Sequence, residues 1–140
     1  MYAFFMGVFR TLFLVLFFQF SLVVPAIAGT IDPVMDLSRQ FALCLGRYSA
    51  EMEHRFLLGE SADQSIARRD LFEDLLFAVG ADVSDLGVNE ARILSLRIEA
   101  KHAQKRLLHT ATFNGNHRLA RHAKARALRE IRTCDMLALR

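Results

Sequence analysis

The sequence predicts an all-α fold, a small antiparallel bundle of about four helices that follows an N-terminal signal peptide. Three observations support this prediction. After residue 28, apolar residues recur at spacings of three and four in four separate segments, as on one face of a helix. Short stretches rich in glycine, asparagine and serine separate these segments. No segment after residue 28 alternates between apolar and polar residues as a half-buried strand does.

Residues 1–28 have the composition of a cleavable secretory signal. Arg10 is their only charged residue, and an apolar run covers residues 11–24. Pro25 then precedes the tripeptide Ala26-Ile27-Ala28. Small residues at the first and third positions before a bond suit signal peptidase. The apolar run is also shorter than the ~20 residues that cross a bilayer.

Cleavage after Ala28 would leave residues 29–140 as a single helical domain of 112 residues. The expected location of this domain is the periplasm or the outside of the cell. The alternative is that the N-terminal segment is kept as a membrane anchor, and the first residue is either Met1 or Met6. No part of the mature chain is apolar enough for a stable transmembrane span.

The first helix is expected to start at Pro33 and to stop before Gly59. Asp32 is a good N-cap, and a proline at the first helical position loses no hydrogen bond. Gly59 can adopt the left-handed conformation that ends a helix. Gly46 weakens the helix slightly and would allow another helix to approach closely. The apolar face consists of Val34, Leu37, Phe41, Cys44, Leu45, Tyr48, Met52 and Phe56.

The second helix is expected to begin at Ser61, because Gln64 three residues later completes a capping box. We expect it to end at Gly80, where a loop over residues 80–87 begins. Asn89 would then cap the third helix. The apolar residues of the second helix are Ile66, Leu71, Phe72, Leu75, Phe77, Ala78 and Val79.

A strong turn signal, Asn114-Gly115-Asn116, separates the third helix from a fourth that runs from about His117 to Leu137. Short connections of this kind make neighbouring helices antiparallel. The apolar face of the third helix is Ile93, Leu96, Ala100, Ala103, Leu107 and Ala111. That of the fourth is Leu119, Ala120, Ala123, Ala127, Ile131, Cys134 and Leu137.

The chain has two cysteines, Cys44 and Cys134. An oxidising compartment favours a disulfide between them, and the alternative is two buried free thiols. Both lie on the apolar faces of their helices, so the bond would join the first helix to the fourth through the core. Closing so long a loop would stabilise the fold by about 4–5 kcal/mol in the chain-entropy model.

Charge is divided along the chain. Residues 29–90 hold five arginines against twelve acidic residues, a net charge of −7, and residues 91–140 hold twelve basic against three acidic residues, a net charge of +9. This asymmetry predicts either a basic face that binds an acidic envelope protein or an anionic lipid surface, or neutralisation of the two halves within the fold. The basic face lies opposite the apolar side of the fourth helix and comprises Arg118, Arg121, Arg126, Arg129 and Arg132.

The motif Glu-x-x-His occurs twice, once on the first helix and once on the third. With one glutamate from each of the other two helices, the chain resembles ferritin-like di-iron proteins, and the resemblance implies a two-metal site in the bundle core. On a helical wheel, however, both histidines point away from the core. The motifs also lie on other helices than in that family. Metal binding therefore stays the alternative hypothesis, with the ligands Glu51, His54, Glu73, Glu99, His102 and Glu130.

No motif in the sequence names a reaction. A glycine-rich phosphate loop, a nucleophile elbow and a Cys-x-x-Cys-His haem site are all missing, so we expect no cofactor and no catalytic residue. The basic face has no aromatic residues between its arginines, so nucleic acid is not an expected partner. The sequence favours a non-enzymatic binding or assembly module of the cell envelope.

Overall fold

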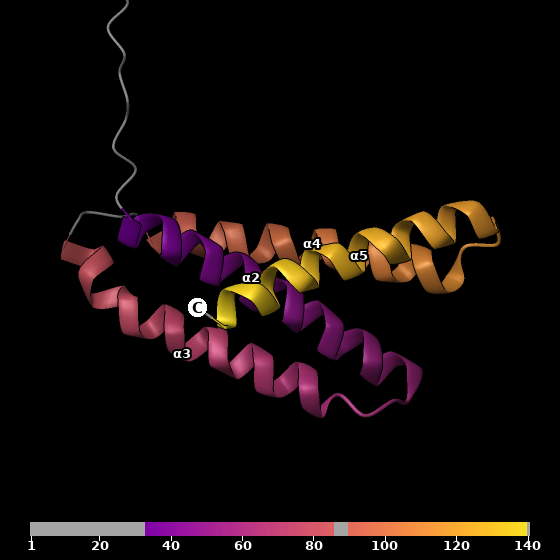
Figure 1. Ribbon diagram of the computed structural model, residues 1–140, viewed down its shortest axis with the longest axis horizontal. Helices are drawn as coiled ribbons and strands as arrows, with labels where there is room; N and C mark the ends of the chain where they lie inside the picture. Colours follow the sequence, from indigo (N-terminus) through magenta and orange to yellow (C-terminus); the bar gives the residue numbers. More distant parts are fainter. Residues whose placement is uncertain (1–32, 86–89, 140) are drawn as a thin grey trace, which may run out of the picture. The chain divides into compact units, whose positions relative to one another are not determined.

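The computed structural model describes residues 33–85 and 90–139, which form four α-helices (Figure 1). The expected signal peptide, residues 1–28, lies outside the described residues, as does the expected cap Asn89. The described helices belong to one compact unit. They are α2 (Pro33–Leu58), α3 (Asp63–Asp85), α4 (Glu90–Phe113) and α5 (His117–Ala138).

The all-α bundle is confirmed, and two helix ends follow the local chemistry expected for them. Gly59 ends α2 with a φ of 69°, a conformation that a side chain would strain. Asn116 caps α5, because its side-chain oxygen accepts hydrogen bonds from the backbone N–H groups of Arg118 at 3.1 Å and Leu119 at 3.2 Å.

Both ends of α3 differ from the expectation. The helix begins at Asp63 rather than Ser61, and the Ser61 hydroxyl bonds to the side chain and backbone N–H of Asp63 instead of forming a capping box with Gln64. Gly80 does not end the helix, which continues to Asp85. Gly80 keeps a helical backbone, since glycine inside a helix costs only about 1 kcal/mol relative to alanine.

Helix α2 is the centre of the bundle and contacts α3, α4 and α5. Its most extensive contact is with α4, which runs parallel to it (Figure 1). The two helices approach most closely at Gly46, where an added Cβ would lie 2.2 Å from the backbone oxygen of Arg97. Glycine is therefore required at this crossing, as its position in the first helix suggested.

The apolar core lies between α2, α3 and the second half of α5. The rings of Phe41 and Tyr48 lie 6.2 Å and 5.9 Å from that of Phe72, which is fully buried. The predicted disulfide joins Cys44 to Cys134 beside these rings, with a Cα–Cα distance of 5.5 Å. Phe77, expected in the core, is instead 87% exposed on α3, because α2 covers only one side of that helix.

The α4–α5 hairpin is built with smaller side chains. Apart from Cys134, its buried residues in the described ranges are three alanines and one polar residue, Gln104. The Gln104 amide nitrogen donates to a Glu51 carboxylate oxygen at 3.0 Å and to the backbone oxygen of Ala127 at 3.3 Å, so one side chain ties α4 to both α2 and α5. The three alanines are Ala100, Ala123 and Ala127.

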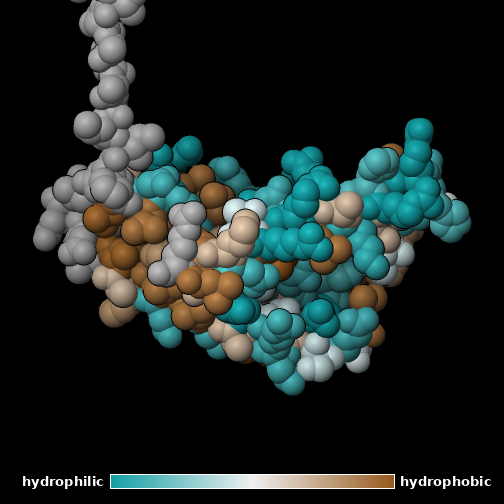
Figure 2. All heavy atoms as spheres, viewed as in Figure 1, coloured by the Kyte–Doolittle hydropathy of each residue, from teal (hydrophilic) through white to brown (hydrophobic). Residues whose placement is uncertain are grey.

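The surface of the described bundle is apolar at one end and hydrophilic at the other. Apolar residues gather over the start of α2 and the ends of α3 and α5, whereas hydrophilic residues cover the α4–α5 hairpin (Figure 2). None of the helices in the described ranges combines the length and the apolarity that crossing a membrane requires.

Candidate functional site

The five arginines of the predicted basic face form one surface along α5, which we name the α5 basic surface: Arg118, Arg121, Arg126, Arg129 and Arg132. All five side chains are exposed. Within the described ranges none of them forms an ion pair. From Arg118 to Arg132 the surface covers 15 residues of α5, which is a rise of about 21 Å at 1.5 Å per residue.

Three cations of α4 are placed differently, because acidic residues of other helices face them. Lys101 lies 2.5 Å and Lys105 lies 3.9 Å from the carboxylate oxygens of Glu53 on α2. Arg97 lies 3.6 Å from Glu73 on α3. Neutralisation of the basic half by the acidic half therefore occurs within the fold, but it reaches only part of α4. The arginines of the α5 basic surface have no ion-pair partners among the described residues.

The two acidic residues of α5 do not neutralise that surface, because both face α2 and α3. Glu130 forms an ion pair with Arg47 of α2. Asp135 accepts a hydrogen bond of 2.7 Å from the Tyr48 hydroxyl and lies 3.6 Å from Arg68 of α3. The outer side of α5 is consequently cationic along most of its length.

Tyr48 is a structural residue of this inner network. Burial raises the pKa of its hydroxyl, and the hydrogen bond to the Asp135 carboxylate raises that pKa further. The hydroxyl is therefore held protonated as a donor to Asp135, an arrangement unsuited to a general base.

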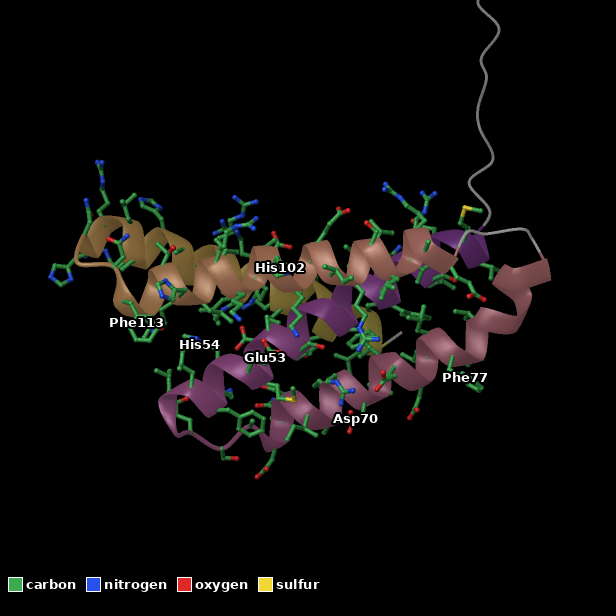
Figure 3. The ribbon with its side chains drawn as sticks, turned by 180° about the vertical axis from the view of Figure 1, so that it is seen from behind. Glu53, His54, Asp70, Phe77, His102 and Phe113 are labelled. Carbon is green, nitrogen blue, oxygen red and sulfur yellow. A yellow bond between two sulfur atoms is a disulfide. The ribbon has the colours of Figure 1, made fainter. Side chains whose placement is uncertain are left out.

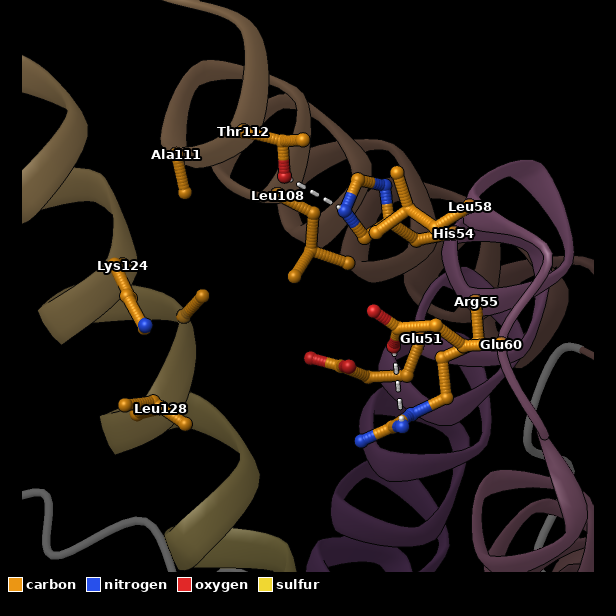
Figure 4. A pocket seen from close by; sticks show the side chains of 11 residues that line it. Glu51, His54, Arg55, Leu58, Glu60, Leu108, Ala111, Thr112, Lys124 and Leu128 are labelled. Carbon is orange, nitrogen blue, oxygen red and sulfur yellow. Dashed lines mark hydrogen bonds and ion pairs between the residues drawn. The ribbon is translucent and has the colours of Figure 1, made fainter.

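A mixed cleft of about 330 Å³ lies between the end of α2 and the α4–α5 hairpin (Figure 4). Glu51 and Glu60 project into it from the α2 side, and Lys124 and Leu128 line the opposite wall on α5 (Figure 4). The side-chain amide of Gln104 bonds through its nitrogen to Glu51 of this cleft, and its oxygen is buried without a hydrogen-bond partner in residues 33–85 and 90–139. Sequence reasoning did not find this cleft, because its walls come from three helices.

A second hollow, a groove of about 530 Å³, lies between the start of α2, α3 and the end of α5. Its walls are mostly apolar, in keeping with the hydrophobic region of Figure 2. The lining residues are Asp36, Leu37, Gln40, Phe41, Leu71, Leu75, Leu137 and Ala138.

The residues of the alternative metal site have separate partners. Glu51 accepts from Gln104, and the His54 ring bonds to the Thr112 hydroxyl at 2.9 Å. Glu99 accepts from Ser95, and His102 is exposed on α4, away from His54 (Figure 3). In residues 33–85 and 90–139, no three His, Cys, Asp or Glu side chains are grouped so that they could hold a metal ion. The two other glutamates of that set, Glu73 and Glu130, form ion pairs.

Comparison of the chain with models of protein families, with curated proteins and with solved structures gives no match.

Proposed function

We propose that this protein is exported and acts as a non-enzymatic binding or assembly module of the cell envelope or periplasm. In this proposal, the α5 basic surface contacts an acidic envelope protein or an anionic lipid surface. Arginine suits both partners, because its planar guanidinium donates two hydrogen bonds to a carboxylate or phosphate.

One observation carries the proposal. The five arginines of the α5 basic surface are exposed and without ion pairs in the described part of the chain, while Glu130 and Asp135 on the same helix face inward. Charges of one sign on one side of a helix create a local potential that attracts an anionic partner.

Export rests on two further features. The disulfide between Cys44 and Cys134 is consistent with an oxidising compartment outside the cytoplasm. Residues 1–28 have the sequence pattern of a secretory signal. Cell fractionation followed by mass determination tests this part: we expect an extracytoplasmic protein that begins at Gly29. A cytoplasmic protein with its leader intact would contradict it.

The binding test compares the protein with a triple variant, Arg118→Glu, Arg126→Glu and Arg129→Glu. Immobilised polyglutamate and phosphatidylglycerol vesicles serve as anionic probes. We expect the protein to bind at least one probe at low salt and to be released as the Debye length falls from ~10 Å at 0.1 M to ~3 Å at 1 M salt. The triple variant should bind neither probe.

A control variant carries the same change in charge at exposed arginines elsewhere, namely Arg39→Glu, Arg92→Glu and Arg106→Glu. It should retain most of the binding. If both triple variants lost binding to the anionic probes equally, or if binding did not respond to salt, the α5 basic surface would not be the surface that contacts the probes.

A further inference from the structure

We propose that α5 binds the surface of an anionic phospholipid bilayer, with its outer side lying against the headgroups. This inference rests on the function proposed above and selects one of its two partners. It concerns three exposed apolar residues that were not assigned to the apolar face of this helix: Leu128 and Met136 on α5, and Leu139, which caps its C-terminal end.

These apolar residues continue the line of arginines along one side of the helix. Residues three or four apart are neighbours on a helix surface, and such spacings connect the members of one exposed stripe from the start of α5 to its end. The four arginines of this α5 stripe lie between residues 118 and 132 with Ala125 and Leu128 among them, and its last two members are apolar. Its members are Arg118, Arg121, Ala125, Leu128, Arg129, Arg132, Met136 and Leu139.

The exposed fractions show that the apolar members of the stripe do not serve the bundle core. Met136 is 62% and Leu139 is 80% exposed, and Leu128, which also lines one wall of the cleft between α2 and the α4–α5 hairpin, is 46% exposed. The core contacts of α5 are made from its other side, by Ala123, Ala127 and Cys134. The exposed apolar residues therefore need another reason to lie beside arginines.

A bilayer surface accepts both kinds of residue at once. Arginines reach lipid phosphates, and neighbouring leucine and methionine side chains enter the boundary between headgroups and acyl chains. The charge of the stripe complements an anionic leaflet, because it contains no acidic residue. An acidic protein would need apolar side chains of its own placed to meet this part of the stripe, whereas a bilayer offers acyl chains beneath every phosphate.

The first test measures binding to vesicles of phosphatidylglycerol and of phosphatidylcholine. It uses the protein as isolated after export, so that every variant has the same N-terminus. We expect binding to phosphatidylglycerol only. Each basic residue near an anionic surface contributes about fivefold in affinity, so Arg121→Glu with Arg132→Glu should weaken binding by about 25-fold or more. The control pair Arg39→Glu and Arg92→Glu should change it far less.

The second test locates the contact. The chain contains no tryptophan, so Met136→Trp introduces a single fluorescent reporter at the apolar end of the stripe. Its emission should shift to the blue on phosphatidylglycerol vesicles and be quenched by brominated lipid. Phe77→Trp is the matched reporter, because Phe77 is 87% exposed and lies on α3, outside the α5 stripe (Figure 3). Its emission should stay unchanged.

The outcomes separate this inference from the proposed function. Salt-sensitive binding to polyglutamate without binding to phosphatidylglycerol vesicles would overturn the lipid inference and leave the proposed function in place. Failure to bind either probe would overturn both. Equal quenching of the two tryptophan reporters would also contradict the inference, because α5 would then not be the side that meets the bilayer.

Discussion

The region around the Cys44–Cys134 disulfide and the α4–α5 hairpin are built from different side chains. The first buries the rings of Phe72 and Tyr48 and pairs its charged groups across helices. The second buries alanines and Gln104, and it exposes arginines without partners in the described part of the chain. The difference shows that large buried rings are concentrated where α2, α3 and the end of α5 meet, whereas the hairpin is packed through small side chains and leaves its arginines exposed.

Removal of the disulfide is expected to have the largest effect on the stability of the region around it. Changing both cysteines to alanine should lower the free energy of unfolding by about 4–5 kcal/mol, because the bond closes a loop with a sequence separation of 90 residues. Chemical denaturation measures the change. A loss below about 1 kcal/mol would show that packing alone holds α5 on α2.

Gly46→Ala tests the place where the hairpin docks on α2. Alanine favours a helix by about 1 kcal/mol over glycine, but its Cβ would lie 2.2 Å from the Arg97 backbone oxygen. We expect the steric cost to prevail and stability to fall by about 1–3 kcal/mol. Gly80→Ala is the matched control, since nothing lies within 4 Å of its Cβ, and it should raise stability slightly. A neutral Gly46→Ala would mean that α4 is loosely docked.

Asn116→Ala tests the tip of the hairpin. Loss of the N-cap should reduce stability by about 1 kcal/mol and speed hydrogen exchange at the amides of Arg118 and Leu119, which bond to the Asn116 side chain. Asn116→Asp retains an accepting oxygen and should behave like the original protein. Slow exchange in the alanine variant would contradict the role of this cap.

Tyr48→Phe tests the inner network through its pH dependence. The pKa of Tyr48 is raised in the folded state, so its contribution is complete below the unfolded-state pKa of about 10. It is lost as the pH rises above that value, because the unfolded chain then releases a proton that the folded chain keeps. The variant lacks the hydrogen bond to Asp135, so its free energy of unfolding at pH 7 should be lower by about 1 kcal/mol. Above pH 10 its stability should fall less steeply than that of the original protein.

Arg129→Ala gives the smallest expected effect on stability. The side chain is exposed and has no ion pair in residues 33–85 and 90–139, so the free energy of unfolding should change by no more than about 0.5 kcal/mol. Thermal denaturation provides the measurement. A clear loss of stability would assign the α5 basic surface a structural role and weaken the comparison between the two regions.

Helix boundaries could be predicted where one residue decides the local backbone. Pro33, Gly59 and Asn116 lie at helix ends because their chemistry suits those positions whatever surrounds them. The prediction that Gly80 ends its helix was wrong, because a glycine inside a helix costs only about 1 kcal/mol and does not by itself end the helix. The disulfide was predictable because the number of cysteines, the expected oxidising compartment and the positions of both residues on apolar helix faces all favoured it.

Contacts between helices were less predictable, because a single helix does not reveal which of its sides a neighbour covers. Phe77 matched the apolar pattern yet lies exposed, and polar Gln104 is buried between three helices. The pairing of Lys101 with Glu53 likewise depends on the parallel packing of α2 and α4 (Figure 1), and the arginines of the α5 basic surface have no such partner among the described residues. Short loops alone predicted only antiparallel neighbours.

The position of the disulfide has a consequence for the newly made chain. All of α3 and α4 lies between Cys44 and Cys134, so the bond can form only after both of these helices and most of α5 have been synthesised. Oxidation therefore marks molecules in which Cys134 has reached the oxidising compartment. A molecule that stalls earlier carries two reactive thiols, and alkylation of these thiols during secretion would count unfinished molecules directly.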